Sequence, residues 1–334
     1  MAAAAERVPP VFLEHEPHEK GFARVFAREI APRLDELEQK RVHRRKQAKW
    51  GHAALLTGLI FLVAFLSYVV FLFAVGDPLA RDGFFDFVLT LVVFVLVELC
   101  FTSLGLYLEL SARKEHHRDL QDLIVGPVGR FLGDLEHVSN PLKRFDLHRF
   151  RGLGVIPPHQ AAHLDAMFVG RHGPTLFSTA EAHLYQGRRR LAFKGRLYVI
   201  GVPRSFSAHV IVEGDPAPGG VAPQARTRLH GLDRVSAGRS RAAVGFRIYS
   251  DDPAEARALA TGEVLREVEH LADGDDVSPR AVFSHGTLYL AVPKGGSPFD
   301  PDLLGRSARD YGRDVRALLR DLTAPRRLIE LLSR

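Results

Sequence analysis

Glu98 is a carboxylate inside a long apolar run of the sequence. It is the one charged residue between positions 87 and 108, and an ionised carboxylate near the middle of a transmembrane helix is costly. Glu98 could face a cavity as a proton or ion site, with Thr102 four residues further on. We favour a protonated Glu98 that hydrogen-bonds to a hydroxyl of the first apolar run, such as Thr57 or Ser67, or to a neighbouring subunit, and so fixes helix packing.

A histidine pair is the second candidate for chemistry. His159 and His163 are four residues apart, with Asp165 nearby. Both imidazoles would project from one face of a short helix that begins at Pro158. Two imidazoles do not complete a zinc site, and the sequence names no further ligands. We therefore expect neither a metal nor another cofactor.

Three carboxylates near position 252 resemble a general acid–base site. Asp251 and Asp252 are adjacent, and Glu255 follows three residues later. A local role explains them better, because Asp252 as N-cap, Pro253 at the first helical position and Glu255 at N3 would form a capping box. Asp300 begins the last predicted helix in the same way. We expect Asp252, Glu255 and Asp300 to start helices and expect no catalytic residue among them.

Composition and missing motifs exclude several classes of protein. The chain has 334 residues, 46% apolar and 25% charged, which is typical of folded proteins and not of disordered ones. Its one cysteine, Cys100, rules out an intrachain disulfide. The sequence has no phosphate-binding loop, dinucleotide-binding glycine turn, Gly-x-Ser-x-Gly nucleophile, His-Glu-x-x-His or Cys-x-x-Cys motif. An enzyme of another kind remains as a third hypothesis.

Two apolar runs are long enough to cross a bilayer. Residues 53–75 carry no charge and residues 87–108 carry only Glu98, so we expect spans at about 51–75 and 87–110. The turn between them is acidic, whereas both flanks are basic, so both termini should be cytoplasmic. We therefore expect a cytoplasmic arm at 1–49, a transmembrane hairpin at 50–111 and a cytoplasmic domain at 112–334, in a bacterial inner membrane.

Basic residues flank the two predicted spans. His116 and His117 lie among these charges and are expected at the membrane interface. The residues that could meet anionic lipid headgroups are Arg41, Arg44, Arg45, Lys46, Lys49, Arg113 and Lys114. More arginines lie at 188–190 and within 226–247, but neither a recognition helix nor an aromatic RNA-binding platform accompanies them. We expect no nucleic-acid partner.

The arm should form an amphipathic helix. Its apolar residues recur at spacings of four, four, four and three, on one stripe. They are Phe22, Phe26, Ile30, Leu34 and Leu37. Such a stripe needs cover from another helix of the chain, a second subunit or the membrane surface. Residues 112–137 repeat the pattern more weakly, and Pro127 should bend or break that helix.

The remaining chain predicts an α+β domain with an antiparallel sheet and flanking helices. Period-two alternation at 176–184, a turn at 186–189 and the apolar run 191–202 indicate one hairpin. Residues 281–283 and 288–292, around the turn 284–287, indicate another. Strands also fit 208–212 and 244–249. Helices fit 253–271 and 301–332, the latter with a break near Pro325. Strict strand–helix alternation is missing.

This order of parts resembles a bacterial two-span membrane family, domain of unknown function 3137. The resemblance rests on LAFKGRLYVIGV at 191–202, FRIYSDDPAEARALAT at 246–261 and AVFSHGTLYLAVP at 281–293. It covers about residues 21–332 and is most specific at Phe193-Lys194-Gly195. It implies a bacterial inner-membrane protein with a cytoplasmic α+β domain, and it supplies neither an activity nor catalytic residues.

Two functional hypotheses from different classes remain besides an enzyme. The first is a non-enzymatic scaffold, in which the hairpin anchors an interaction domain and the arm and Glu98 support a homo-oligomer or a membrane-protein partner. The second is an oligomeric channel or transporter subunit, with Glu98 lining a path and Asp77, Asp82 and Asp86 at its mouth. Replacing Glu98 by Gln separates them, because ion flux and assembly would respond differently.

Overall fold

A computed structural model gives the architecture. It describes residues 12–75, 84–133, 135–138, 140–187, 190–214, 231–236, 245–272, 278–294 and 311–334. The chain forms two compact units. The described part of the first, the hairpin unit, is 27–75 and 84–124. The described part of the second, the α+β unit, comprises 12–26, most of 125–294 and 312–334.

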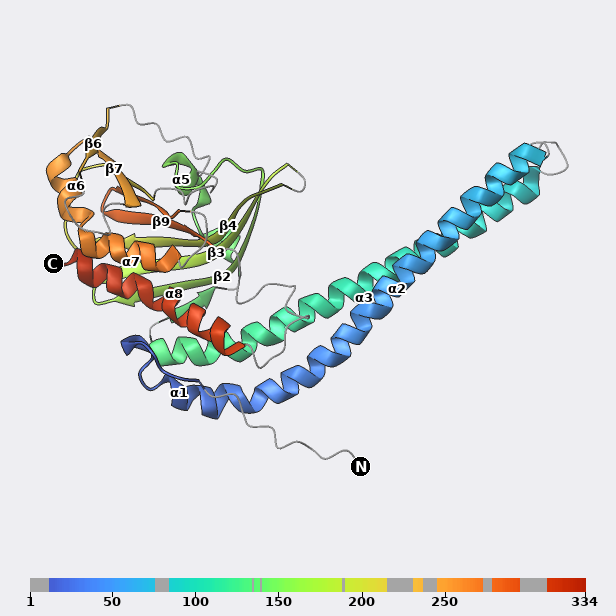
Figure 1. Cartoon of the computed structure of the whole chain (residues 1–334), viewed down its shortest axis with the longest axis horizontal. Helices are drawn as coiled ribbons and strands as arrows, with labels where there is room; N and C mark the ends of the chain where they lie inside the picture. The colour runs from blue at the N-terminus through green and yellow to red at the C-terminus, as the bar shows by residue number, and fades with distance from the viewer. Residues whose placement is uncertain are drawn as a thin grey trace. The chain divides into compact units, whose positions relative to one another are not determined.

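Two long helices form the hairpin unit, side by side (Figure 1). A 3-10 turn, η1 (Pro17–Glu19), and α1 (Phe22–Val25) lead into a π-helical turn, η2 (Phe26–Ile30), and then into α2 (Ala31–Val75). The widened turn ends two residues before Pro32, which has no N–H to donate to the preceding turn. The return helix α3 is Phe84–Leu132. Both helices extend well beyond their apolar runs.

Glycines let α2 and α3 approach closely. A Cβ atom at Gly51 would lie 2.7 Å from the carbonyl oxygen of Gly105, and one at Gly105 would lie 2.8 Å from that of Gly51. Further along, the stacked rings of Phe65 and Phe94 have centroids 3.8 Å apart. Backbone contact between small residues is the usual packing mode of transmembrane helices.

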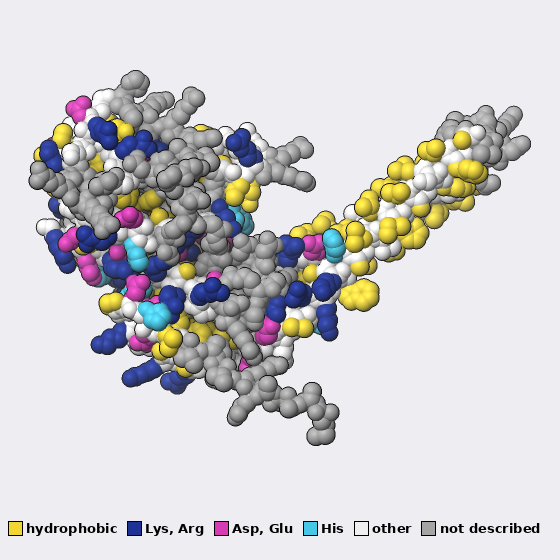
Figure 2. Space-filling view, in the orientation of Figure 1, with side chains coloured by type: hydrophobic (Ala, Val, Ile, Leu, Met, Phe, Trp, Pro, Cys, Tyr) yellow, Lys and Arg dark blue, Asp and Glu magenta, His cyan; other side chains and the backbone are white. Residues whose placement is uncertain are grey.

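The far part of the hairpin is apolar on its outside. Both helices are long and apolar enough to span a membrane, and almost none of either apolar segment is buried. Hydrophobic side chains cover this part of the surface, with Lys, Arg, Asp and Glu beyond one end of it (Figure 2). Large exposed apolar side chains in water are unfavourable over such an area. The predicted spans therefore coincide with two exposed apolar helices.

Within the described residues, nine antiparallel strands form one sheet in the order β1-β2-β3-β4-β9-β8-β5-β7-β6. Their bounds are β1 Leu135–Val138, β2 Ala161–His172, β3 Thr175–Gln186, β4 Arg190–Gly201, β5 Val210–Gly214, β6 Asp233–Val235, β7 Phe246–Ser250, β8 Arg280–Ser284 and β9 Thr287–Pro293. The α+β class and the antiparallel sheet predicted from the sequence are confirmed.

Both predicted hairpins are present. Strand β3 pairs with β4, and β8 pairs with β9 around His285 and Gly286, which have φ of 50° and 71°. In the Phe-Lys-Gly motif, a Cβ at Gly195 would lie 2.2 Å from the Val292 carbonyl oxygen. Glycine at position 195 is therefore required for β4 to pair with β9. The sequence did not predict β1 or β6, which are short edge strands.

Helices cover both faces of the sheet, where two apolar clusters lie. On one side are α6 (Pro253–Leu259), α7 (Gly262–Ala272) and α8 (Tyr311–Leu332), with α7 and α8 side by side (Figure 1). On the other are α4 (Pro141–Arg144) and α5 (Leu147–Gly152), where Phe150 is fully buried. The central strands β5, β8 and β9 are therefore mostly buried.

Two helix predictions were wrong, and of the bend or break predicted at Pro127 the break does not occur. The helix predicted at 253–271 is two helices, because Ala260 leaves helical geometry (φ −92°, ψ 57°) and Thr261 Oγ1 accepts from the Val264 N–H at 3.4 Å. The chain stays helical through Pro127 and through Pro325. Each proline lies beside fully buried leucines and isoleucines, and this packing outweighs the lost hydrogen bond.

The apolar stripe of the arm is buried within the chain. All five residues of the stripe, Phe22 to Leu37, are at most 4% exposed. In the α+β unit, Phe22 packs edge-on against Phe12 and Phe131, with centroids 5.0 Å apart in both pairs. Glu19 anchors the same segment by accepting from Arg316 Nε at 2.8 Å. The sequence left three possible partners for the stripe: another helix of the chain, a second subunit or the membrane surface. In the structure, the chain itself covers the stripe.

Candidate functional site

Glu98 faces α2 in the hairpin. A Cβ atom at Gly58 would lie 3.1 Å from Glu98 Oε2. Glu98 Oε1 is buried and has no hydrogen-bond partner among the described residues. The hydroxyls of Thr57 and Ser67 donate to carbonyls of their own helix, 2.9 Å away in both cases. Thr102, one turn further along α3, is exposed.

Two basic residues predicted near the headgroups are held inside the hairpin unit. Arg41 is 6% exposed, and its Nε donates to Glu38 Oε2 at 2.9 Å. Arg44 Nη1 donates to Asp119 Oδ2 at 3.0 Å, across the two helices. Charge-assisted hydrogen bonds of this kind fix both partners. These arginines therefore join α2 to its own turns and to α3.

The other basic residues predicted near the headgroups fall into two groups, one paired with a carboxylate and one exposed. Arg113 Nη2 donates to Glu109 Oε1 at 2.7 Å, one turn earlier on α3. The rest are exposed and form no ion pair with any residue that the structure describes: Arg45, Lys46, Lys49 and Lys114. We call these four the basic collar. Their ammonium and guanidinium groups are available to an outside partner.

The sequence predicted that His116 would lie at the membrane interface. In the structure it lies between α2 and α3 instead. It is 2% exposed. Burial, together with the nearby charges of Arg44 and Arg41, lowers its pKa to about 4, while Asp119 and Glu38 act in the opposite direction. The imidazole is therefore neutral at pH 7, and its protonation would place a third cation among the two arginines.

The predicted histidine pair does not lie on a helix. His163 is in β2, and His159 is in the loop before it, where its ring lies 3.2 Å from the Pro157 carbonyl oxygen. His163 Nε2 lies 2.9 Å from Asp165 Oδ2, which raises the pKa of the histidine. Strand pairing with β3 overrides the helix start at Pro158. Within the described ranges, no cluster of three or more ligating residues could hold a metal.

The acidic motif binds backbone N–H groups. Asp252 Oδ1 accepts from Ala254 at 2.8 Å and Glu255 at 3.0 Å, as an N-cap does. Glu255 does not reach back to complete a capping box, because its Oε2 accepts from the N–H groups of Ser207 and Ala208 at 2.9 and 2.6 Å. Asp251 accepts from His209 N–H at 2.8 Å. All three carboxylates thus join loops to the start of α6.

An enzyme that used Asp251 together with His159 or His163 would need these residues to converge on one point. Asp251 follows β7, whereas His163 is in β2, and five strands separate β2 from β7 in the sheet. These residues therefore do not share a site. Asp300, Asp77, Asp82 and the arginines at 188, 189, 226, 228, 239 and 241 lie outside the described residues.

A charged cluster that the sequence did not reveal lies between the sheet and α8. Arg196 of β4 and Asp321 of α8 are each 1% exposed, with Arg196 Nε 3.1 Å from Asp321 Oδ2. Lys294 also contacts Asp321, and Arg196 Nη2 lies 3.6 Å from Glu181 Oε2 of β3. Burial lowers the pKa of Arg196, but Asp321, Tyr198 and Glu181 together outweigh it and leave the pKa raised.

The four charged side chains of this cluster balance one another in charge, and none of them is exposed. Two cations, Arg196 and Lys294, face two anions, Asp321 and Glu181. Beside them the hydroxyl of Tyr198 is buried, and burial raises its pKa. Two features of the sequence could have indicated this cluster. Asp321 lies in the middle of a helix within an apolar stripe, and one side of the alternating strand β3 is polar. Glu181, on that side of β3, is 5% exposed and lies beside Arg196, which pairs with Asp321 of α8.

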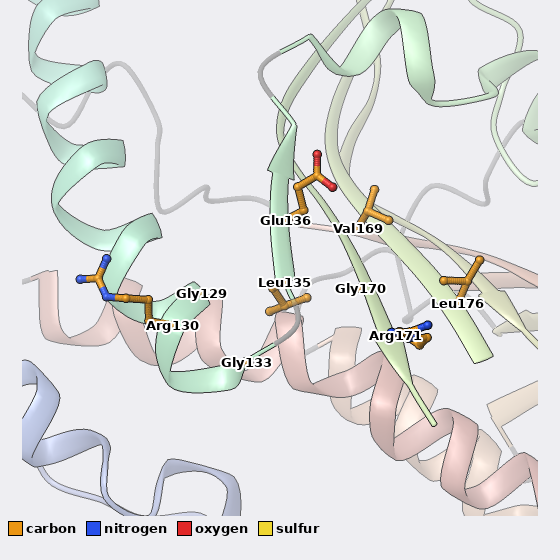
Figure 3. Close-up of a pocket in the computed structure, with 9 residues that line it drawn as sticks. All are labelled: Gly129, Arg130, Gly133, Leu135, Glu136, Val169, Gly170, Arg171 and Leu176. Carbon is orange, nitrogen blue, oxygen red and sulfur yellow. The ribbon is translucent and has the colours of Figure 1, made fainter. Parts of the chain in front are cut away.

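An open pocket of about 610 Å³ lies beside the edge strand β1 (Figure 3). Apolar Leu135, Val169 and Leu176 share its lining with Arg130, Arg171 and other residues. The guanidinium of Arg130 points away from β1 (Figure 3). The hollow therefore combines a few apolar side chains with charges of both signs, without converging catalytic groups.

Comparison with known proteins concerns mainly the C-terminal part of the chain. No curated protein matches. One solved structure, the crystal structure of the mycobacterial trehalose monomycolate transport factor A, TtfA, is similar at 12% identity and a TM-score of 0.33, over 62% of this chain and 93% of that chain. Residues 191–334 match the family model described as protein of unknown function (DUF3137). The family resemblance predicted from the sequence is therefore confirmed.

Proposed function

We propose that this chain is a membrane-anchored, non-enzymatic interaction module of the bacterial inner membrane. The hairpin holds the protein in the bilayer, and the α+β unit is presented on the cytoplasmic side. The observation that carries the proposal is the exposed apolar exterior of α2 and α3, which no part of the described chain covers. Such a surface is stable in hydrocarbon and unfavourable in water.

The orientation rests on charge. The exposed cations Arg45, Lys46, Lys49 and Lys114 lie at the end of the apolar segments that joins the rest of the chain. Lys and Arg near transmembrane ends resist translocation. Both termini and the α+β unit are therefore assigned to the cytoplasm.

The interaction role is assigned to the α+β unit. The arm stripe, which the sequence left in need of a partner, is buried by the chain itself. The acidic motif and the buried charges are engaged in N-caps and ion pairs that stabilise the fold. This leaves the outer surface of a rigid three-layer unit as the part that can meet another protein.

Extraction and labelling test the anchor and its orientation. The chain should stay in membranes washed with alkaline carbonate. In a Cys100→Ser background, Leu176→Cys, at a 64% exposed position of β3, should react with an impermeant maleimide only after the inner membrane is opened, whereas Asp82→Cys should react in intact spheroplasts. Release by carbonate contradicts the anchor, and labelling of Leu176→Cys in intact spheroplasts contradicts the orientation.

Crosslinking tests the interaction role. Lysine-reactive crosslinking in native membranes, read by mass spectrometry, should join peptides of the α+β unit to a second protein reproducibly. Crosslinks confined to hairpin residues of two copies, including disulfides through the exposed Cys100, would instead favour a homo-oligomer built in the membrane.

The second candidate is an oligomeric channel or transporter subunit. One observation favours it: the buried Oε1 of Glu98, which has no hydrogen-bond partner among the described residues. Intramembrane carboxyls often mark ion or proton paths. Glu98→Gln in proteoliposomes decides between the candidates. Lost ion flux with unchanged assembly supports transport, whereas unchanged flux, or no flux in either protein, contradicts it.

A further inference from the structure

The structure separates the basic residues near the membrane into two groups. Arg41, Arg44 and Arg113 are engaged with carboxylates of the hairpin. The basic collar, Arg45, Lys46, Lys49 and Lys114, is exposed. A sequence reading treats all seven alike, but only the collar has cationic groups that point to a partner outside the chain.

Aromatic residues continue the collar toward the apolar surface. Trp50 lies four residues after Lys46, and Tyr107 lies seven residues before Lys114, so each aromatic shares a helix face with a collar residue. Trp50 is 72% exposed and Tyr107 is 68% exposed. Exposed Trp and Tyr beside cations are typical of the zone where hydrocarbon meets headgroups.

The two helices carry this pattern at the same level. Gly51 contacts α3 between Gly105 and Glu109, which puts Trp50 beside the turn that contains Tyr107. One turn further from the apolar end, Gln47 Nε2 lies 3.5 Å from Ser111 Oγ. The aromatic residues of α2 and α3 thus form one belt, and the collar lies directly beyond it.

The dimensions fit a lipid headgroup layer. Lys49, Lys46 and Arg45 precede Trp50 by one, four and five residues, or at most about 7.5 Å along the helix axis. Lys114 follows Tyr107 by about 10 Å. The polar layer on each side of a bilayer is roughly 5–8 Å thick, and flexible Lys and Arg side chains reach several ångströms further.

We propose that the basic collar binds anionic lipid headgroups and recruits acidic phospholipid around the hairpin. This inference rests on the proposed membrane anchor and names its lipid partner. The opposite charge of the phosphodiester matches the four cations, and the adjacent aromatic belt fixes their depth. Nucleic acid or an acidic protein would not account for the exposed Trp50 and Tyr107 next to the cations.

Trp50 is the only tryptophan of the chain, so its fluorescence reports lipid contact at the collar. The full-length protein is reconstituted into phosphatidylcholine vesicles that contain equal mole fractions of either dibrominated phosphatidylglycerol or dibrominated phosphatidylcholine. Bromine quenches only lipid-contacting tryptophan. We expect the anionic lipid to be favoured by about fivefold or more, because the attraction of one Lys or Arg to an anionic surface already gives a preference of about that size. We expect 0.5 M NaCl to reduce the preference.

A matched pair of double variants gives the control. Lys46→Gln with Lys49→Gln and Arg41→Gln with Arg113→Gln each remove two positive charges, the first from the collar and the second from residues paired within the hairpin. We expect the collar pair to lose most of the anionic preference and the paired-arginine variant to keep it within about twofold. Lys46→Arg with Lys49→Arg should retain it. Taking the quenching ratio within each variant cancels changes in Trp50 brightness.

The outcomes are distinguishable. Equal quenching by both lipids in the wild type, or equal losses in both double variants, overturns the collar inference while leaving the anchor intact. If the paired-arginine variant does not fold, retention in the arginine-for-lysine variant and loss in the collar pair decide the question. Absence of quenching by either brominated lipid contradicts the membrane anchor itself.

Discussion

The hairpin unit and the α+β unit bury opposite kinds of surface. In the α+β unit, apolar side chains fill two clusters on the faces of the sheet. In the far hairpin, the large apolar side chains are outside and the helices meet through Gly51 and Gly105. The difference supports the proposed membrane anchor, because the hydrophobic effect packs a core in water but cannot pack helices in lipid.

The two units also handle charge differently. Arg196, Asp321, Glu181 and Lys294 are buried together and compensate one another. Among the described residues, the apolar segment of the hairpin carries Glu98 alone, and the lysines and arginines of the hairpin lie at one end of that segment. Buried charge is thus tolerated in the α+β unit through pairing and is largely avoided in the hairpin, as their different surroundings require.

Arg196→Met should give the largest loss of stability. It leaves Asp321 buried with only Lys294 to compensate it, and breaking a buried ion pair costs about 3–5 kcal/mol. We expect roughly 3 kcal/mol because Lys294 remains. Calorimetric unfolding of the detergent-solubilised chain measures it, with exposed Arg190→Met as the control, expected within about 0.5 kcal/mol. A loss below about 1 kcal/mol for Arg196→Met would show that the cluster does not hold α8.

The sequence predicted the parts of the fold that depend on local pattern. Alternation in β3 and the Ser-His-Gly-Thr turn of β8 and β9 are short-range signals, and both hairpins formed. The helix does not break at Pro127, and the break predicted near Pro325 was wrong, because packing around each proline outweighs its local preference. The split between α6 and α7 at Ala260 was missed, although Gly262, the first residue of α7, is a local signal for it.

Acidification should loosen the hairpin next to His116. The folded pKa of His116 is about 4, against 6.5 when unfolded, so the unfolded state binds more protons between these values and stability falls as pH falls through them. From pH 7 to pH 5 we expect a loss of about 2 kcal/mol. Hydrogen exchange of peptides across 112–120, corrected for intrinsic rate, measures it.

His116→Phe should remove this pH dependence. The exposed His52→Phe provides the control, and it should leave the dependence unchanged. Equal protection of wild-type peptides at pH 7 and pH 5 would contradict a neutral His116 packed between α2 and α3.

Gly105→Ala should weaken the helix contact by a smaller amount. Its Cβ would lie 2.7 Å from Leu55 Cγ and 2.8 Å from the Gly51 carbonyl oxygen, so the helices must separate slightly, at a cost of about 1 kcal/mol. Ser103→Ala, at an exposed position of α3, should be neutral. Steric trapping or thermal unfolding in detergent compares the two. Equal stability of both variants would place the helix contact elsewhere.

The candidate sites were less predictable than the fold. The N-cap role of Asp252 follows from adjacent residues and is present. Which cations are engaged with carboxylates and which are exposed depends on the register of α2 against α3, set by the contact of Gly51 with Gly105. Arg44 reaches Asp119, 75 positions away. The cluster of Arg196 and Asp321 likewise needs α8 to return to the sheet, which no local pattern encodes.

The depth of the hairpin in a bilayer tests the central claim most directly. Trp50 should be quenched most by lipids brominated near the headgroup. Cys100 precedes Tyr107 on α3 by about 10 Å, toward the middle of the apolar segment. A fluorophore on Cys100 should be quenched most by lipids brominated near the bilayer centre. We predict this order of depths, with both probes shielded from iodide. Ready iodide access to the probe on Cys100 would contradict a membrane-spanning hairpin.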